Sequence, residues 1–332
     1  MPKIVDQVRF AEALGYDTAW IIDSQLLAPD IYVKLTACAL QTQRIALGAG
    51  VTNTVTRNPT VTAGALASIA DLAPGRVRAA LSLGGSSVTS IGVPLARLAQ
   101  FREDVRLIAR LLQGEATDYN GKRIKLVWAN PAVSSQVPLS IQGHGPKGQQ
   151  LAGEMGLPLG VSCEVQRLGR CIEEIQAGAA RAGRPSQDIE LRWSGQTTIS
   201  EDWQVIKEQR LSQAATFIRE RYLIYRRGGM GPEDVPVDLK LAERIAESYD
   251  WLEHASAGAS HARVLLDYPV DQWRQWLKGQ FIGTPEEVRQ VVQQGLEHPC
   301  VREVVLGLHV GTDHLSVEQN MEAFAKRVRP FL

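Results

Sequence analysis

The chain has 332 residues, enough for two domains of average size or for one large barrel. Hydrophobic residues make up 44% of the chain and charged residues 22%, as in ordinary globular proteins. Its 36 basic and 36 acidic residues balance. This balance argues against a protein that binds nucleic acid or an anionic membrane, because both classes carry a basic excess.

The cysteines and the N-terminus indicate a protein of the cytoplasm. The four cysteines are Cys38, Cys163, Cys171 and Cys300, and no two have the Cys-x-x-Cys spacing of a zinc ribbon or a redox dithiol. The first residues lack a secretory leader, and no apolar run approaches the roughly 20 residues needed to cross a bilayer. We therefore expect reduced thiols, no metal site, and a cytoplasmic protein without membrane or nucleic-acid partners.

Helical and strand patterns alternate along most of the chain. The predicted strands cover 18–22, 44–51, 77–83, 137–142, 157–162, 189–199 and 303–308. The predicted helices cover 4–14, 30–41, 60–72, 94–112, 147–155, 165–182, 285–294 and 317–328. Two segments break the alternation. Residues 114–136 contain an Asn-Gly dipeptide typical of a small hairpin, and 201–280 is helical and rich in tryptophan.

Strands separated by helices imply parallel pairing through right-handed crossovers. The predicted fold is a single α/β domain, a (β/α)8 TIM barrel with 114–136 and 201–280 as insertions. Seven strands are one too few for this barrel, and the chain opens on a helix, so the first strand is expected to be missing. An open dinucleotide-binding sheet is the alternative, but Gly48–Asn53 lacks the third glycine of its fingerprint.

Small and polar residues follow four of the predicted strands: Gly50–Thr54, Gly84–Ser87, Gly143–Gly148 and Ser162–Cys163. In a parallel barrel the active site lies at this carboxyl end of the strands. Glycines let the backbone approach a ligand, and amides at a helix start favour an anion, so 143–148 would suit a phosphate. The alternative is that these segments are only tight turns. His144 and His309 are equally ambiguous between ligand contacts and structural hydrogen bonds.

No serine-hydrolase elbow and no phosphate-binding P-loop occurs, so the chemistry is expected to come from an organic cofactor. Several segments resemble the bacterial-luciferase-like superfamily, and its coenzyme F420-dependent reductases of the methylenetetrahydromethanopterin reductase type in particular. The segments that carry the resemblance are Trp20–Asp23, Leu47–Asn53, Thr56–Ala63, Gly75–Val77, Leu83–Ser86, Arg102–Glu103, Val137–Ile141, Gly145–Lys147 and Gly283–Val288.

The resemblance implies a barrel of the bacterial luciferase-like type that binds coenzyme F420, or alternatively FMN, at its carboxyl rim. It implies catalytic roles for Asp23 and Ser24, although Asp23 could instead only cap a strand end. Family members commonly have histidine where this chain has Ser24. They also carry a cis peptide bond that maps to Gly50–Val51. The implied cofactor-binding residues are Gly50, Val51, Thr52, Asn53, Gly84, Gly85, Ser86, Gly143, His144, Gly145, Pro146, Ser162 and Cys163.

Three functions remain open at this point. The preferred one is an F420-dependent oxidoreductase that transfers hydride between the deazaflavin and a small organic substrate, as a homodimer. The second is an FMN-dependent monooxygenase with a partner reductase, and the third is a flavin-binding homologue that has lost its catalysis. Four tryptophans in 201–280 (Trp203, Trp251, Trp273 and Trp276) predict either a packed helical core or a lid over the substrate.

Overall fold

The computed structural model describes residues 2–143, 145–185, 188–228, 230–253, 259–308 and 317–332. The chain forms two compact units, which we describe separately. The N-terminal unit comprises Met1–Val161 and Arg170–Arg192, and the C-terminal unit comprises Ser162–Gly169 and Trp193–Leu332. No described helix has both the length and the apolar character needed to cross a membrane.

The N-terminal unit is built on parallel strands that follow each other in chain order. Each strand pairs with the next: β1 (Thr18–Ile21), β2 (Ala46–Asn53), β3 (Val77–Ser82), β6 (Leu139–Gln142) and β7 (Leu159–Ser162). All five were predicted from apolar runs. Residues before β1 form a helix, as the sequence indicates, and the described residues contain no earlier strand.

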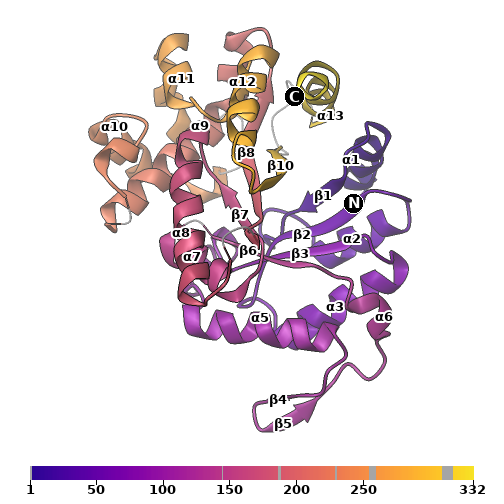
Figure 1. Cartoon of the computed structure of the whole chain (residues 1–332). Helices are drawn as coiled ribbons and strands as arrows, with labels where there is room; N and C mark the ends of the chain where they lie inside the picture. Colours follow the sequence, from indigo (N-terminus) through magenta and orange to yellow (C-terminus); the bar gives the residue numbers. More distant parts are fainter. Residues whose placement is uncertain (1, 144, 186–187, 229, 254–258, 309–316) are drawn as a thin grey trace. The chain divides into compact units, whose positions relative to one another are not determined.

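Helices connect and cover these strands (Figure 1). They are α1 (Pro2–Ala13), α2 (Ile31–Ala39), α3 (Pro59–Leu72), α4 (Ser86–Thr89), α5 (Leu98–Leu112), α6 (Pro131–Ser134), α7 (Pro146–Met155) and α8 (Leu168–Arg181). Side chains cap the two helices nearest the candidate site. Asp30 accepts hydrogen bonds from the first amides of α2, and Asn58 caps α3 in front of Pro59. The caps explain why both helices begin directly after their loops.

The predicted hairpin is present in the N-terminal unit. Strands β4 (Thr117–Tyr119) and β5 (Lys122–Ile124) pair antiparallel and project from the helices around them (Figure 1). Asn120 and Gly121 connect them with φ of 49° and 72°. Positive φ at both central residues is the requirement of a type I′ turn, which confirms the Asn-Gly prediction.

The C-terminal unit has strands of its own. Strand β8 (Leu191–Ile199), which begins at the boundary of the units, pairs with β10 (Val301–Gly307) and with β9 (Phe281–Gly283). The sequence did not reveal β9, because three residues are too few to show a strand pattern. Helices α12 (Pro285–Leu296) and α13 (Val317–Ala323) belong to this unit, and a π-helical turn (Phe324–Val328) follows α13.

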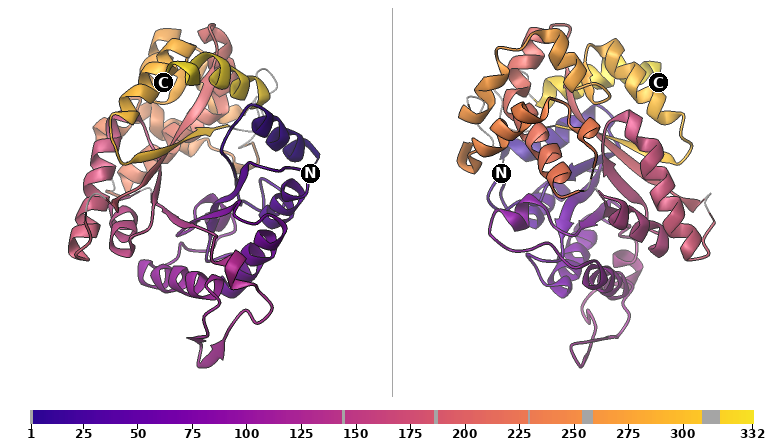
Figure 2. Two further views of the ribbon diagram at one scale, coloured as in Figure 1. Left: turned by 45° about the vertical axis from the view of Figure 1, so that its right-hand side comes forward. Right: turned by 90° about the vertical axis from the view of Figure 1, so that its left-hand side faces the viewer.

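The segment 201–280 is helical, as predicted. It contains α9 (Trp203–Arg226), α10 (Leu239–Glu247) and α11 (Val270–Trp276), and α10 and α11 each pack against α9 (Figure 2). Short 3-10 turns at Pro232–Asp234, Trp251–Glu253 and Ser260–Leu265 connect them. Trp203, Trp273 and Trp276 are all buried in one hydrophobic cluster with Ile206 and Ile218. The packing interpretation is therefore confirmed for these three tryptophans, whereas the side chain of Trp251 lies outside the described part. The lid remains a prediction.

Candidate functional site

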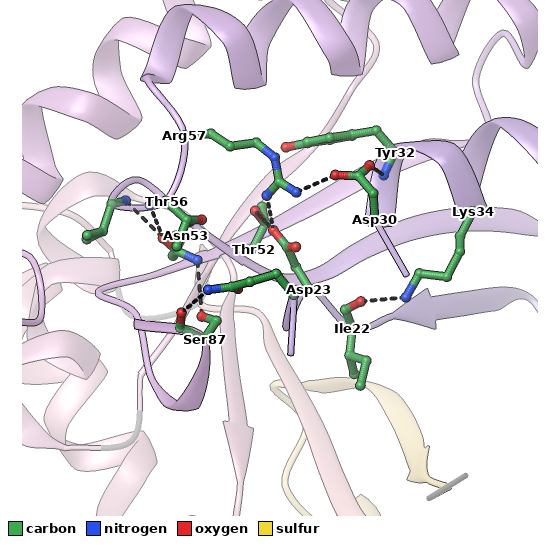
Figure 3. Close-up of polar contacts among 12 residues, drawn as sticks. Ile22, Asp23, Asp30, Tyr32, Lys34, Thr52, Asn53, Thr56, Arg57 and Ser87 are labelled. Atoms are coloured by element: carbon green, nitrogen blue, oxygen red, sulfur yellow. Dashed lines mark hydrogen bonds and ion pairs between the residues drawn. The ribbon is translucent and has the colours of Figure 1, made fainter. Parts of the chain in front are cut away.

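The C-terminal ends of β1 and β2 bring the first candidate residues together (Figure 3). Asp23 follows β1 by two residues, and Thr52 lies near the end of β2. The two strands are parallel neighbours, so their carboxyl ends meet at one edge of the sheet. The Thr52 hydroxyl donates a hydrogen bond of 2.7 Å to Oδ2 of Asp23, and both residues are buried. The structure thus joins two residues that were predicted separately, one as catalytic and one as cofactor-binding.

Arg57 connects this pair to a second carboxylate. Its guanidinium lies 2.6 Å from Oδ2 of Asp23 and, through its other terminal nitrogen, 2.6 Å from Oδ2 of Asp30. The Asp23 side chain is only 3% exposed, whereas that of Asp30 is 44% exposed. The guanidinium also lies over the Tyr32 ring, 5.1 Å from its centroid. Arg57 therefore bridges a buried acid and a surface acid.

Burial and charge act in opposite directions in this network. Burial opposes the charged form of Arg57, but its hydrogen bonds with Asp30 and Asp23 raise its pKa above the usual value. Burial likewise opposes ionisation of Asp30, but Arg57 and the α2 amides hold the pKa of that carboxyl below its usual range. Burial lowers the pKa of Lys34, whose ammonium donates to the carbonyl of Ile22 at 2.9 Å. The Arg57–Asp30 ion pair is therefore charged at neutral pH.

Ser24, the second predicted catalytic residue, lies next to Asp23 in the sequence and is 6% exposed. Its hydroxyl is buried and has no hydrogen-bond partner among the described residues. The Thr54 hydroxyl, just beyond the end of β2, is also buried and also has no hydrogen-bond partner among the described residues. An unpaired buried hydroxyl costs free energy, which a polar group of a ligand would recover.

Strand β2 bulges where the resemblance placed a cis peptide bond. The Gly50–Val51 peptide is cis, and the register with β3 shifts between Gly50 and Thr52. The Trp20 indole fills the space beside this strand. A Cβ atom on Gly48 or Gly50 would lie 2.2 Å or 2.4 Å from its Cε3 atom. Glycine at both positions is therefore required by the indole.

An arginine from the start of β8 supports the same indole. The Arg192 guanidinium lies 3.9 Å from the Trp20 ring centroid and donates to Ser140 and Gln142 on β6 at 3.1 Å and 3.0 Å. Gly160 leaves room for these groups, because a Cβ there would lie 2.1 Å from the Gln142 amide oxygen. The bulged strand thus has a packed support inside the N-terminal unit.

The loop after β3 contains Gly84, Gly85 and Ser86. Gly84 has φ of 107°, which favours glycine, whereas Gly85 is exposed and a Cβ there would meet nothing within 4 Å. Ser86 begins the four-residue helix α4. This loop contacts the end of β2, because the Asn53 amide nitrogen donates to Ser87 Oγ at 3.2 Å.

The side chain of Asn53 also accepts hydrogen bonds within its own loop. Its amide oxygen accepts hydrogen bonds from the amides of Val55 and Thr56 at 2.9 Å and 2.8 Å, and from the Thr56 hydroxyl. This Asx turn directs the chain from β2 toward Arg57. The predicted cofactor contact of Asn53 stays a prediction, as do those of Gly50, Val51 and Thr52.

The two glycines of the turn after β6 differ. A Cβ on Gly143 would lie 3.0 Å from the backbone of Gly148 and Gln149, so this glycine allows the strand end and α7 to approach closely. Gly145 is the N-cap of α7, directly before Pro146, has no side-chain cap, and faces open space. His144 lies outside the described residues, and so does His309.

We expect Gly145→Asp to separate cofactor binding from stability. Aspartate is a favoured N-cap and the site has room, so the variant should be as stable as the wild-type protein or more stable by a few tenths of a kcal/mol. If the turn holds a phosphate, the added carboxylate repels it and cofactor affinity should fall at least about tenfold. Fluorescence titration and urea unfolding measure the two effects. Unchanged affinity in the folded variant would show that the turn is only structural.

Ser162 and Cys163 lie in the C-terminal unit. Ser162 is exposed at the end of β7, and Cys163 is buried. The Cys163 carbonyl accepts a hydrogen bond of 2.9 Å from the Trp193 indole nitrogen. Their predicted contacts with a cofactor tail stay predictions.

Sequence reasoning missed Arg57, Asp30 and Trp20 as parts of the site. Arg57 stands in a segment that carried the family resemblance, and Trp20 opens another, but neither had a role assigned to it. Asp30 stands at the start of the helix predicted over 30–41, and no further role was assigned to it. The involvement of Arg57 and Asp30 depends on contacts between residues 34 and 27 positions apart, and that of Trp20 on its contact with Arg192. No local pattern reports such contacts.

Comparison with known proteins identifies the family. The family model described as luciferase-like monooxygenase matches residues 1–303. The chain is 27% identical over 332 residues to a 5,10-methylenetetrahydromethanopterin reductase of Archaeoglobus fulgidus, covering 98% of this chain and 94% of that protein. It is 32% identical over 203 residues to an F420-dependent glucose-6-phosphate dehydrogenase of Beutenbergia cavernae, covering 54% of this chain and 59% of that protein.

A solved structure shows the fold. The coenzyme F420-dependent tetrahydromethanopterin reductase of Methanopyrus kandleri matches with a TM-score of 0.80 at 24% identity, covering 99% of this chain and 95% of that one. The predicted luciferase-like barrel fold is thereby confirmed. Together with the family match over residues 1–303, this establishes that the chain belongs to the luciferase-like monooxygenase family.

Proposed function

We propose that this protein is an oxidoreductase that uses coenzyme F420 to transfer hydride to or from a small organic substrate. The observation that carries the proposal is the buried Ser24 hydroxyl beside Asp23, which has no hydrogen-bond partner among the described residues. Such a group fits a site that a polar ligand completes. Similarity to a protein named as an F420-dependent dehydrogenase supports the deazaflavin as that ligand.

The residues of the N-terminal unit fit a planar ring with polar edges. The Ser24 and Thr54 hydroxyls are buried without a partner among the described residues and would pair with such edges, and Asp23 would offer its carboxylate. The bulge at Gly50–Val51 offers backbone at the strand end. At the other end of the cofactor, the open cap position at Gly145 would suit a phosphate. When bound, the deazaflavin supplies a carbon that accepts or donates hydride.

The protein's own contribution would be positioning. Hydride transfer requires the donor and acceptor carbons within about 3–3.5 Å of each other and shielded from water. The Trp20–Arg192 stack supports the bulged strand from the interior, and Arg57 and Thr52 hold Asp23 from one side. A site fixed in this way loses little entropy when the ring and the substrate bind.

Cofactor titration of the purified protein tests the proposal. We expect coenzyme F420 to bind with a change in its fluorescence, and FMN to bind more weakly. The absorbance of reduced F420 in air should change only when a carbonyl, imine or enone acceptor is added. Tight FMN binding with oxygen consumption and no F420 binding would instead identify a monooxygenase. Binding of F420 without turnover of any acceptor class would indicate a non-catalytic homologue.

A further inference from the structure

Asp23 carries two hydrogen bonds on the same carboxylate oxygen. The Thr52 hydroxyl and the Arg57 guanidinium both donate to Oδ2, at 2.7 Å and 2.6 Å. Oδ1 has no hydrogen-bond partner among the described residues. A carboxylate held through one oxygen keeps the other available, with its direction set by the two donors.

The position of Arg57 is itself determined from both sides. The Asn53 turn sets the path of the backbone before it, and Asp30 anchors the second terminal nitrogen of its guanidinium (Figure 3). Asp30 is in turn immobilised as the α2 cap, where its Oδ1 accepts from the Tyr32 and Val33 amides at 2.9 Å and 3.2 Å. The guanidinium fork therefore links the start of a rigid helix to the buried acid.

We propose that Arg57 is a positioning residue for Asp23, which it holds through Oδ2 so that Oδ1 accepts a hydrogen bond from the bound cofactor or substrate. This inference rests on the proposed function, because it requires a ligand beside Asp23. It adds to that function a residue that does not touch the ligand and acts only through the aspartate.

Arginine is suited to this role in a way that lysine is not. The fork places two donors in one plane, so that the two acids are held at once and the carboxylate plane of Asp23 is fixed. An ammonium group is a point charge that can contact Asp23 without fixing its orientation. Arg57→Lys should therefore retain part of the F420 affinity that Arg57→Gln loses.

A double-mutant cycle on the full-length protein tests the inference. Dissociation constants for coenzyme F420 are measured by fluorescence titration for Arg57→Gln, Asp23→Asn and the double variant. Arg57→Gln should weaken binding about tenfold in the wild-type background and less than about twofold in Asp23→Asn, because the arginine acts through the aspartate. Arg57→Lys should fall between the wild-type protein and Arg57→Gln.

Asp30→Asn tests the outer anchor of Arg57. Asparagine caps helices as well as aspartate does, so α2 keeps its start while the guanidinium loses its outer anchor. Affinity for F420 should fall, but by less than in Arg57→Gln, because the guanidinium keeps its contact with Asp23 while it loses its outer anchor. The thermal midpoint should fall as well. If Arg57 instead served only to hold its loop against α2, Asp30→Asn and Arg57→Gln would lower stability equally, and both would leave F420 affinity unchanged.

The outcomes separate this inference from the proposed function. Folded Arg57→Gln and Arg57→Lys variants with wild-type F420 affinity, or losses that add in the double variant, would overturn the role of Arg57 alone. A wild-type protein that binds FMN and not F420 would overturn the proposed cofactor, and the same cycle measured with FMN then decides the role of Arg57. A wild-type protein that binds neither would overturn both.

Discussion

Replacing Gly48 with alanine is expected to lower the free energy of unfolding by about 1–3 kcal/mol, the usual cost of overpacking a dense core. The new Cβ would lie 2.2–2.6 Å from three atoms of the Trp20 indole. The indole cannot retreat easily, because the Arg192 guanidinium lies 3.9 Å from its ring centroid. Either the ring or the strand must move, and β2 pairs with a neighbour on both sides.

Urea unfolding measures this effect, and two further variants show its origin. Gly85→Ala is the control, because its Cβ meets nothing within 4 Å. It should change stability by less than about 0.5 kcal/mol. Trp20→Leu should recover part of the loss when combined with Gly48→Ala. Equal stabilities of Gly48→Ala and Gly85→Ala would contradict the packing account.

Asp23→Asn is expected to have the largest effect on activity, a loss of roughly a hundredfold in kcat/KM if the carboxylate contacts the reacting groups. The substitution conserves shape but removes the charge that faces Arg57, whose guanidinium then keeps only Asp30. Because a buried charged hydrogen bond is lost as well, the free energy of unfolding should fall by about 1–3 kcal/mol.

Ser24→Ala is the matched comparison for Asp23→Asn. Its hydroxyl has no partner among the described residues, so removing it should leave stability unchanged or slightly raise it. Cofactor affinity should nevertheless fall if the hydroxyl binds the ligand. Steady-state kinetics and unfolding of both variants check these expectations. Full activity of a folded Asp23→Asn protein would show that Asp23 has no catalytic role and only ends the strand.

The sequence by itself determined most of the elements of this protein. Apolar runs predicted the strands of the N-terminal unit, and the caps Asp30 and Asn58 stand where helices α2 and α3 begin. The Asn-Gly dipeptide predicted the hairpin and its turn. These features could be predicted because local chain conformation depends on residues a few positions apart, whose order the sequence states directly.

Resemblance to a family added what local patterns could not. It predicted the cis peptide between Gly50 and Val51 and the importance of the β2 end, and both the peptide and the bulge are present. It did not assign a role to Arg57, although that residue stood in a segment used for the resemblance. A shared motif indicates where a site lies without stating which atoms meet there.

The tertiary structure alone decided the contacts that organise the candidate site. Arg57 reaches Asp23 across 34 positions and Asp30 across 27, and Trp20 determines that Gly48 and Gly50 must be glycine. Strand β9, three residues long, exists because its backbone pairs with β8. In each case the decisive energy comes from groups that are distant in the chain and meet only when the strands pair in parallel. These contacts depend on the packed tertiary structure, which a short stretch of sequence does not specify.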